Sequence, residues 1–352
     1  MRYYNVGLVG CGHMGAIHVK QLLKKNTRAV LKGIFDIDAD KCINIAKDNN
    51  LRIYSSLDEM ICDNEIDIIV VAVPNHLHKD ICIAALEHKK NVITEKPIAI
   101  TYADAAAMYE AAEHNGMLLS VDQNRRYNYD FQTVKKLITD NTVKDVYRIE
   151  SYADASNSIP GGWRLVREEG GGMILDWGVH LIDQIMQIFT GKITHVYCRT
   201  FSLRYPDIDD NFDFEICFDD IITAKVGVMT NNYAPRARWR VYGKQSTLIM
   251  NGWNGCVSVI EKKQSSDLDS ASDDNVNCTR TMRELSSEEK IVKKFDLVKE
   301  YDDSLDSVYD QFINAIENGE LSITSEQILR VMKVIDAAFL SAEQKKVIKT
   351  SI

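Results

Sequence analysis

Three titratable side chains behind a glycine run are spaced for proton transfer. The segment GGGMILDWGVHLID, residues 170–183, places Asp176, His180 and Asp183 four and three residues apart. Residues at these spacings share one face of a helix. A histidine titrates near neutral pH, and a neighbouring carboxylate can fix its tautomer and raise its basicity. The spacing therefore predicts an acid–base site, with a capped helix and a merely solvated polar face as the alternative.

A glycine-rich loop near the N-terminus predicts a second site, for a dinucleotide. An apolar segment, residues 5–9, and a helical run to about residue 25 flank the sequence Gly10-Cys11-Gly12-His13-Met14-Gly15. Glycines at these positions let the backbone turn tightly and approach a pyrophosphate. The N-terminus of the following helix then binds the negative charge.

An acidic residue after the next predicted strand indicates which dinucleotide binds. Asp36 directly follows the strand-like residues 30–35. A carboxylate at this place accepts hydrogen bonds from the adenosine ribose and repels a 2′-phosphate. Ile37 and Asp38 offer such a phosphate no cation. We therefore expect NAD rather than NADP, with a plain turn aspartate as the alternative reading of Asp36.

A lysine at the end of another predicted strand adds a third chemical group. The sequence Thr94-Glu95-Lys96-Pro97 ends the segment that begins at residue 91. Ligands of open α/β sheets bind beyond the carboxyl ends of the strands. A lysine beside a bound nicotinamide can polarise a carbonyl oxygen or stabilise a developing alkoxide. A surface Glu–Lys pair ended by a loop proline is the alternative, and the Lys96–Pro97 bond can be cis or trans.

The elements that must position these groups alternate between strand and helix over residues 1–122. Helices are expected over about residues 39–48, 79–88 and 102–114, and strands near residue 53 and over residues 66–73, 91–94 and 117–121. Apolar strands interleaved with helices indicate a doubly wound parallel sheet. We expect an NAD-binding Rossmann domain over residues 1–122.

The pattern changes after residue 124, where an α+β domain with a large, mainly antiparallel open sheet is expected. A helix over residues 129–138 and a strand over residues 146–152 precede the glycine run, and a terminal helix covers residues 325–342. Between residues 262 and 289 the chain is rich in Ser, Asp and Asn, which fits an excursion from the sheet. We expect residues 123–352 to form a substrate-binding and oligomerisation domain.

Alternation in this second sheet predicts self-association. Phe212, Phe214, Ile216 and Phe218 fill one face, which we assign to the domain's own helices, while Ile221 and Met229 add apolar area on the other face. A sheet that is partly apolar on both faces usually finds a partner. We expect a homodimer or homotetramer joined through this sheet.

Composition excludes several other classes of protein. The chain has 352 residues, a length that suggests two domains. Its net charge is −9 and it has no block rich in Lys and Arg, which disfavours nucleic acid as a partner. No apolar run approaches the length of a membrane span, and the N-terminus lacks the pattern of a signal peptide, so a cytoplasmic location is expected. The eight cysteines form no CxxC pair, and we expect reduced thiols and no metal site.

Together these motifs resemble those of the glucose-fructose oxidoreductase, inositol dehydrogenase and rhizopine-catabolism (Gfo/Idh/MocA) family. The matches run in family order from residue 6 to about residue 190 and are looser beyond. They comprise the glycine-rich loop, Pro74-Asn75 with His78, Glu95-Lys96-Pro97, Asn124-Arg125-Arg126-Tyr127, Trp163-Arg164 and the GGG-x-x-x-D-x-x-x-H-x-x-D run. The resemblance implies a Rossmann domain, a second domain whose sheet forms an oligomer interface, and NAD(P)-dependent redox chemistry on sugars, cyclitols or related polyols.

The resemblance also implies roles for individual residues. Lys96, Asp176 and His180 fall on the family's catalytic set, and Asp183 on a position that contacts substrate hydroxyls. The candidate residues for the cofactor are Gly10, Gly12, His13, Met14, Gly15, Asp36, Pro74, Asn75, His78, Glu95, Lys96, Gln123 and Arg126. The candidates for the substrate are Lys96, Asn157, Trp163, Arg164, Asp176, His180, Asp183 and Tyr233.

The chain departs from the family at two places. Many members carry G-x-x-G near the start of the second domain, where this chain has residues 141–144, NTVK. Residues 154–160, where members often contact substrate, have no specific pattern, which leaves the identity of the substrate open. Asn157 and Tyr233 can each bind a sugar or serve as ordinary loop or sheet residues.

The expected reaction is reversible hydride transfer between nicotinamide and a secondary alcohol carbon of a sugar, glycoside or cyclitol. In this scheme His180 takes the hydroxyl proton, Lys96 stabilises the alkoxide, Asp176 orients His180, and Asp183 accepts hydrogen bonds from neighbouring hydroxyls. Oxidation should then rise with pH through a group that titrates between about 6 and 8.5. Two alternatives stay open: an NAD-dependent glycoside hydrolase with a closed oxidation, elimination and reduction cycle, and a non-catalytic dinucleotide sensor.

Overall fold

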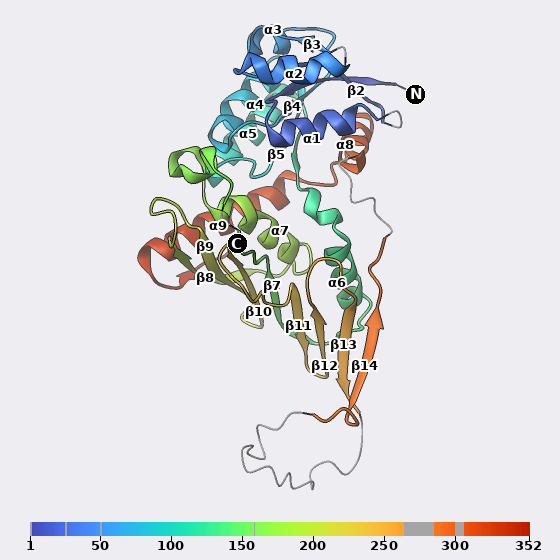
Figure 1. The fold of residues 1–352 in the computed structure, drawn as a ribbon, viewed down its shortest axis with the longest axis vertical. Helices are drawn as coiled ribbons and strands as arrows, with labels where there is room; N and C mark the ends of the chain where they lie inside the picture. Colours follow the sequence, from blue (N-terminus) through green and yellow to red (C-terminus); the bar gives the residue numbers. More distant parts are fainter. Residues whose placement is uncertain (1, 25–26, 50, 158, 264–284, 300–305) are drawn as a thin grey trace.

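The first part of the chain forms a six-stranded parallel sheet with the order β3-β2-β1-β4-β5-β6 in the computed structural model (Figure 1). The structure describes residues 2–24, 27–49, 51–157, 159–263, 285–299 and 306–352. The strands are β1 (Tyr4–Val9), β2 (Ala29–Phe35), β3 (Arg52–Ile53), β4 (Ile68–Val71), β5 (Asn91–Glu95) and β6 (Leu119–Asp122). The helices between them are α1 (His13–Leu22), α2 (Ala39–Asn49), α3 (Leu57–Ile61), α4 (His78–Glu87) and α5 (Tyr102–Asn115). The predicted doubly wound sheet is confirmed.

Burial of the central strand β4 explains why an apolar run in the sequence predicts this strand. All four residues of β4 are buried, because helices cover both faces of a parallel sheet. A strand buried on both faces needs apolar residues throughout, so it appears in the sequence as a continuous apolar run.

A helix from the far end of the chain covers part of this first sheet. Helix α8 (Asp306–Asn318) was not predicted, and it lies beside α1 in Figure 1. Its residues Val308, Tyr309, Phe312 and Ile313 share one apolar cluster with β1 and β2. The expected second domain, residues 123–352, therefore sends one helix back across the boundary at residue 122.

The second part of the chain forms a nine-stranded sheet with the order β14-β13-β12-β11-β7-β10-β9-β8-β15. Of the pairs formed by the described strands, β7 and β10 are parallel and the others are antiparallel. The strands are β7 (Val146–Tyr152), β8 (Ile193–Phe201), β9 (Asn211–Phe218), β10 (Ile222–Met229), β11 (Trp239–Gly243), β12 (Ser246–Met250), β13 (Val257–Lys262), β14 (Lys290–Phe295) and β15 (Ile348–Lys349). The expected excursion joins β13 to β14, and its residues 264–284 lie outside the described residues.

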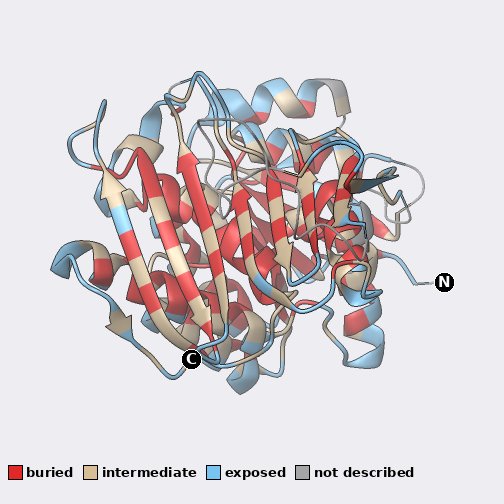
Figure 2. Cartoon of the chain, turned by 90° about the horizontal axis from the view of Figure 1, so that it is seen from below, coloured by how far each residue is buried: buried red, intermediate tan, exposed pale blue. Residues whose placement is uncertain are grey.

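Helices cover one face of this second sheet. They are α6 (Tyr129–Thr139), α7 (Val179–Met186) and α9 (Ser325–Gln344), which ends close to the predicted residue 342. Buried and partly exposed positions alternate along the strands in Figure 2. Phe212, Phe214, Ile216 and Phe218 are all buried, as the alternation predicted. No helix among the described residues is both long and apolar enough to cross a membrane.

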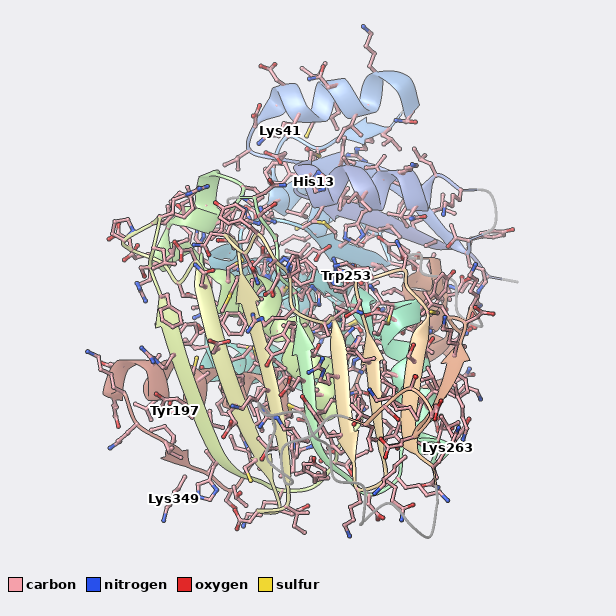
Figure 3. The ribbon with its side chains drawn as sticks, turned by 60° about the horizontal axis from the view of Figure 1, so that its bottom comes forward. His13, Lys41, Tyr197, Trp253, Lys263 and Lys349 are labelled. Atoms are coloured by element: carbon pink, nitrogen blue, oxygen red, sulfur yellow. The ribbon has the colours of Figure 1, made fainter. Side chains whose placement is uncertain are left out.

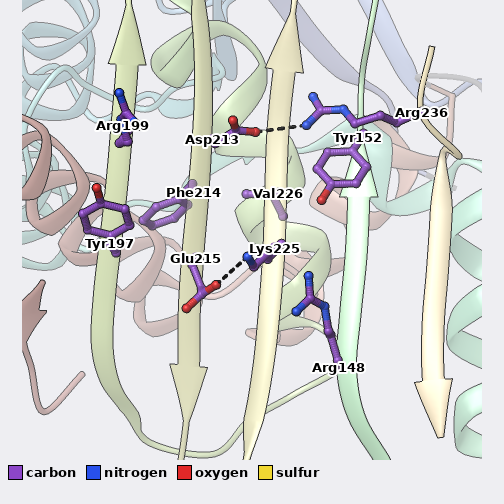
Figure 4. Close-up of a pocket in the computed structure, with 10 residues that line it drawn as sticks. All are labelled: Arg148, Tyr152, Tyr197, Arg199, Asp213, Phe214, Glu215, Lys225, Val226 and Arg236. Atoms are coloured by element: carbon purple, nitrogen blue, oxygen red, sulfur yellow. Dashed lines mark hydrogen bonds and ion pairs between the residues drawn. The ribbon is translucent and has the colours of Figure 1, made fainter. Parts of the chain in front are cut away.

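The other face of the sheet carries charged pairs, while Met229, one of the two apolar residues expected there, is partly exposed at the end of β10. Glu215 pairs with Lys225 at 2.9 Å, and Asp213 pairs with Arg236 at 3.0 Å (Figure 4). These pairs line a hollow of about 330 Å³ on the open face. Ile221, counted as part of the face, lies in the turn before β10 and is 73% exposed. The self-association expected through this face stays a prediction, and its contacts would include charged side chains.

Candidate active site

The glycine-rich loop forms a cradle that fits a pyrophosphate. Gly10 has φ +98°, and a Cβ there would lie 2.4 Å from the carbonyl oxygen of Ala72. A Cβ on Gly15 would lie 2.0 Å from the carbonyl oxygen of Gly10, so helix α1 can approach the loop only without a side chain. A Cβ on Gly12 would meet nothing within 4 Å. The loop thus leaves open space at the N-terminus of α1, where amide groups lack intrahelical partners.

Asp36 closes this cradle at the end of β2. Its Oδ2 accepts a hydrogen bond from the Cys11 amide at 2.7 Å, and its Oδ1 accepts one from the Asp38 amide at 2.8 Å. Each carboxylate oxygen keeps a lone pair that a ribose hydroxyl can use. Lys41, which is labelled in Figure 3, places Nζ 3.4 Å from Oδ2 of Asp38.

Several candidates for the cofactor are instead held inside the protein. His78 is buried, and its ring nitrogens contact the carbonyl oxygens of Pro97 at 2.9 Å and Val73 at 3.0 Å. Burial lowers the pKa of His78, so the neutral ring supports the turn that carries Lys96. Asn75 donates from Nδ2 to the Gly170 carbonyl at 2.9 Å, which joins this turn to the glycine run.

Two further candidates for the cofactor lie at the end of β6. Gln123 is 2% exposed, and Arg126 is 7% exposed and bound to Asp183. The structure therefore does not present either side chain at the surface of the cradle. Pro74 precedes the short helix η1 (Asn75–Leu77), and the peptide bond between Lys96 and Pro97 is cis.

Each glycine of the run at residues 170–172 is required by a close neighbour. A Cβ on Gly170 would lie 2.8 Å from Asn75, and one on Gly171 would lie 2.5 Å from the Arg164 carbonyl oxygen. A Cβ on Gly172 would lie 2.2 Å from Asp209. Asp209 in turn accepts hydrogen bonds from the amides of Met173 and Ile174. The run therefore packs the start of the next helix against three other segments.

The predicted helix face is only partly correct, because residues Ile174–Gly178 form a π-helical turn and α7 begins at Val179. Lys96, at the carboxyl end of β5, donates from Nζ to Asp176 Oδ1 at 2.8 Å and to the Asp176 carbonyl at 2.7 Å. Arg164, in the short helix η3 (Gly162–Leu165), places Nε 3.7 Å from Asp176 Oδ2. Burial would raise the pKa of Asp176, but Lys96 and the neighbouring arginines lower it below its usual range.

His180 lies behind this ion pair and is 4% exposed. Its Nδ1 has no hydrogen-bond partner among the residues that the structure describes, so Asp176 does not orient the ring as expected. Burial holds the pKa of His180 well below 6.5, and Lys96, Arg125 and Arg238 lower it further. The expected titration between 6 and 8.5 is therefore not that of His180.

Asp183 does not join the other two residues of the predicted trio. Asp183 is 1% exposed, and its carboxylate accepts two hydrogen bonds from Arg126, from Nε at 2.7 Å and from Nη2 at 2.6 Å. The pair ties α7 to the short helix η2 (Asn124–Tyr127). The structure thus gives Asp183 a partner in the protein interior where the resemblance implied substrate hydroxyls.

Sequence reasoning missed a cluster of arginine and tryptophan side chains beside His180. The guanidinium of Arg125 lies 4.3 Å from the centre of the Trp177 ring and 5.6 Å from that of Trp253. Arg238 lies 4.3 Å from the Trp253 ring, which is labelled in Figure 3. Cation–π contacts of this kind hold flat side chains in fixed positions. Arg125, Trp177 and Arg238 are more than 50 residues apart, and no spacing in the sequence connects them.

The remaining candidates for the substrate are loop residues. Tyr233 is 82% exposed, and Asn157 is exposed in the segment after β7. Neither forms a contact with Lys96, Asp176 or His180 among the described residues. Trp163 lies beside Arg164 in η3, with the guanidinium 4.4 Å from the ring centre.

A second buried cluster lies under Lys96. His18 Nε2 contacts Glu95 Oε1 at 3.0 Å, and His18 Nδ1 contacts the Tyr309 hydroxyl of α8 at 2.5 Å. Possible ligand atoms of His18, Glu95 and Asp122 lie within 4.8 Å of one another, so these residues can in principle hold a metal ion. Burial and Glu95 raise the pKa of Asp122 to about 8. Glu95, a candidate for the cofactor, is thus engaged in the interior.

Comparison with known proteins gives the same arrangement of domains. Residues 4–123 match the family described as an oxidoreductase family with an NAD-binding Rossmann fold, and residues 131–249 match the GFO/IDH/MocA C-terminal domain. The structure of an NAD-binding protein from Listeria innocua superposes with a TM-score of 0.87, at 30% identity, over 99% of this chain and 97% of that one.

Two proteins with similar sequences match this chain over different shares of their length. The scyllo-inositol 2-dehydrogenase (NADP(+)) IolW of Bacillus subtilis is 25% identical over 350 residues, which cover 97% of this chain and 95% of that protein. An uncharacterized oxidoreductase of Schizosaccharomyces pombe, C115.03, is 38% identical over 142 residues. That match spans 40% of this chain and only 39% of the yeast protein.

Proposed function

The chain belongs to the Gfo/Idh/MocA family of oxidoreductases, and from this premise we propose that it is an NAD-dependent dehydrogenase. Its substrate is a sugar, glycoside or cyclitol, oxidised reversibly at a secondary alcohol carbon. The observation that carries the proposal is the 2.8 Å pair between Lys96, at the carboxyl end of β5, and Asp176, beside His180. Both partners are partly exposed, with 16% and 13% of their side chains accessible.

The glycine-rich loop and Asp36 can hold a dinucleotide, and each binds a different part of it. Bound NAD supplies the acceptor for a hydride at its nicotinamide. The glycine-rich loop holds the pyrophosphate, and Asp36 holds the adenosine ribose. Asp36 also favours NAD, although the name of the B. subtilis relative specifies NADP(+).

In the oxidation, the C–H bond of the alcohol carbon breaks with its electron pair, the O–H bond releases a proton, and a ketone forms. Lys96 places its ammonium where the alkoxide charge develops. Asp176 accepts a hydrogen bond from the same or a neighbouring hydroxyl and keeps Lys96 in place. The low pKa of His180 keeps its ring neutral at pH 7, which leaves a nitrogen able to accept the proton.

We test the proposal with a panel of sugars and cyclitols, monitored by the absorbance of NADH. Lys96→Met and His180→Asn should each lower turnover about 10²- to 10⁴-fold, the usual contribution of a placed acid–base or electrostatic group. NAD binding, measured by calorimetry, should persist in His180→Asn, because the pyrophosphate is assigned to the glycine-rich loop and the adenosine ribose to Asp36. Release of free NADH separates this proposal from a closed hydrolytic cycle.

Variants that keep wild-type turnover would contradict the assigned roles. Binding of NAD without turnover of any member of the panel would favour a dinucleotide sensor.

We also propose self-association through the open face of the second sheet. The charged pairs there, such as Glu215 with Lys225, can be exchanged for pairs with a second copy. Light scattering should return two or four times the chain mass of 39.9 kDa, and high salt should lower that mass. A monomer at micromolar concentration in low salt would contradict this idea.

A further inference from the structure

A buried hydrogen-bonded network holds the turn that carries Lys96. Glu95, the last residue of β5, has a side chain that is only 5% exposed. Its Oε2 accepts a hydrogen bond from the Lys96 amide at 3.2 Å, and its Oε1 lies 3.0 Å from Nε2 of His18. One carboxylate therefore joins the backbone of the lysine to helix α1.

The network continues from His18 to a helix at the far end of the chain. His18 Nδ1 contacts the hydroxyl of Tyr309 in α8 at 2.5 Å. Both side chains are buried, and α8 lies beside α1 (Figure 1). Because Glu95 engages one ring nitrogen of His18 and Tyr309 engages the other, the cluster is already a chain of hydrogen bonds rather than an open set of metal ligands.

The charges of His18 and Glu95 strengthen this chain. Burial opposes the charged form of His18, but the hydrogen bond and charge of Glu95, together with Asp122, raise the pKa of the ring above its usual value. Burial likewise opposes ionisation of Glu95, but His18 and Lys96 lower the pKa of the carboxyl group. A charged His18 donates from both ring nitrogens. Hydrogen bonds between charged groups are stronger than neutral ones and hold their partners more firmly.

The same turn is held from a second side. His78 contacts the Pro97 carbonyl at 2.9 Å, one residue beyond Lys96. The backbone is thus fixed before and after the point from which Lys96 reaches Asp176, to which Nζ donates at 2.8 Å. In the proposed reaction the alkoxide develops at this ammonium. Misplacement of such a group by about 1 Å costs about 10²-fold in rate, so the hold on the turn affects turnover.

We propose that Glu95 and His18 are positioning residues for Lys96, and that Tyr309 extends their hold to helix α8. This inference rests on the proposed dehydrogenase function, because its consequence is the rate of that reaction. It also gives α8 a role: the helix crosses the domain boundary and completes the network that fixes Lys96.

The test is a double-mutant cycle between Glu95 and Lys96 in the full-length enzyme, with NAD and the sugar or cyclitol that gives the fastest release of NADH. Glu95→Ala should lower kcat about tenfold or more, because it frees the Lys96 backbone. In Lys96→Met the same substitution should cost little further turnover, because the ammonium that it positions is already gone. A residue with only a structural role would lose the same factor in both backgrounds.

Conservative variants test whether the hydrogen bonds carry the effect. Glu95→Gln keeps an oxygen that can accept from the Lys96 amide, so it should retain more turnover than Glu95→Ala. His18→Gln keeps a donor toward Glu95, so it should retain more turnover than His18→Leu.

A matched pair of tyrosines keeps the proposal testable if the Glu95 and His18 variants fold poorly. Tyr309→Phe loses only the outer hydrogen bond of the network and should lower kcat about two- to tenfold. Tyr54→Phe is the control, because it removes another buried tyrosine hydroxyl of the first domain, one that donates to Asp63 at 2.8 Å. It should leave kcat unchanged.

The outcomes separate the two proposals. Equal losses from Glu95→Ala in the two backgrounds would overturn the positioning role and leave the dehydrogenase intact, and so would equal kcat in Tyr309→Phe and Tyr54→Phe. If the wild type oxidises no member of the panel, the proposed dehydrogenase fails separately. Crystal structures of Glu95→Ala and Tyr309→Phe then decide: a Lys96–Asp176 pair kept at 2.8 Å in both variants would overturn the positioning role, and a displaced Lys96 would support it.

Discussion

Removal of the Asp183 carboxylate should destabilise the protein strongly, because it leaves a buried cation without its partner. The Asp183 and Arg126 side chains are only 2% and 8% exposed. Arg126 donates two hydrogen bonds to Asp183, at 2.6 and 2.7 Å, and a third at 2.7 Å to Gln327 of α9. In Asp183→Ala, two of these three bonds disappear while the guanidinium remains in the interior.

Breaking a buried ion pair by removing one partner costs about 3 to 5 kcal/mol. For a domain of this size that corresponds to a fall of roughly 6 to 20 °C in the unfolding temperature. Asp183→Asn, which keeps one acceptor oxygen, should lose less. The double variant Arg126→Met with Asp183→Leu should recover much of the loss, because neither charge then stays buried.

Urea unfolding followed by tryptophan fluorescence measures these differences without any substrate. The reasoning would be refuted if Asp183→Ala unfolded at the wild-type urea concentration but raised KM for the sugar. That result would restore the role in substrate binding that the family resemblance implied.

Three further predictions concern the cofactor and the titrating groups. Asp36→Ala should weaken NAD binding about tenfold or more, from the loss of hydrogen bonds to a charged group, and relax discrimination against NADP in calorimetry; a wild type that prefers NADP would contradict the assignment. The pH profile of oxidation should rise through a midpoint below 6.5, because burial and nearby cations lower the pKa of His180, and a His180-dependent midpoint above 6.5 would count against this base. Burial and Glu95 raise the pKa of Asp122 from 3.8 to about 8. Between pH 3.8 and pH 8 the folded protein therefore keeps a proton on Asp122 that the unfolded chain releases, so the free energy of unfolding falls as pH rises. Asp122→Asn should reduce that fall, which unfolding at pH 5 and pH 8 would measure; an unchanged slope would mean that Asp122 is already ionised in the folded state.

The elements of the first domain could be predicted because their signals are local. Buried parallel strands need continuous apolar runs, and the turn at Gly10 needs a residue that tolerates a φ of +98°. The position of Lys96 beyond a strand end follows from the same reasoning, since every strand of a parallel sheet ends at the same edge. These features depend on a few neighbouring residues, and the sequence shows them directly.

The open face of the second sheet could not be judged in the same way. Alternation correctly placed the apolar side chains such as Phe214 toward the helices. It did not show that Lys225 and Arg236 would reach across to carboxylates on β9, because such pairs depend on strand order and register.

The sequence by itself determined the family, the fold class and the three motifs from which the site is built, since each is a short pattern with its own physical requirement. Only the tertiary structure decided which side chains meet. It bonded Asp183 to Arg126, 57 residues away, and brought Tyr309 of α8 to His18 across 291 residues. It also gathered Arg125, Arg238 and Trp253 beside His180. Contacts over such separations arise from the packing of whole elements, and local spacing carries no information about them.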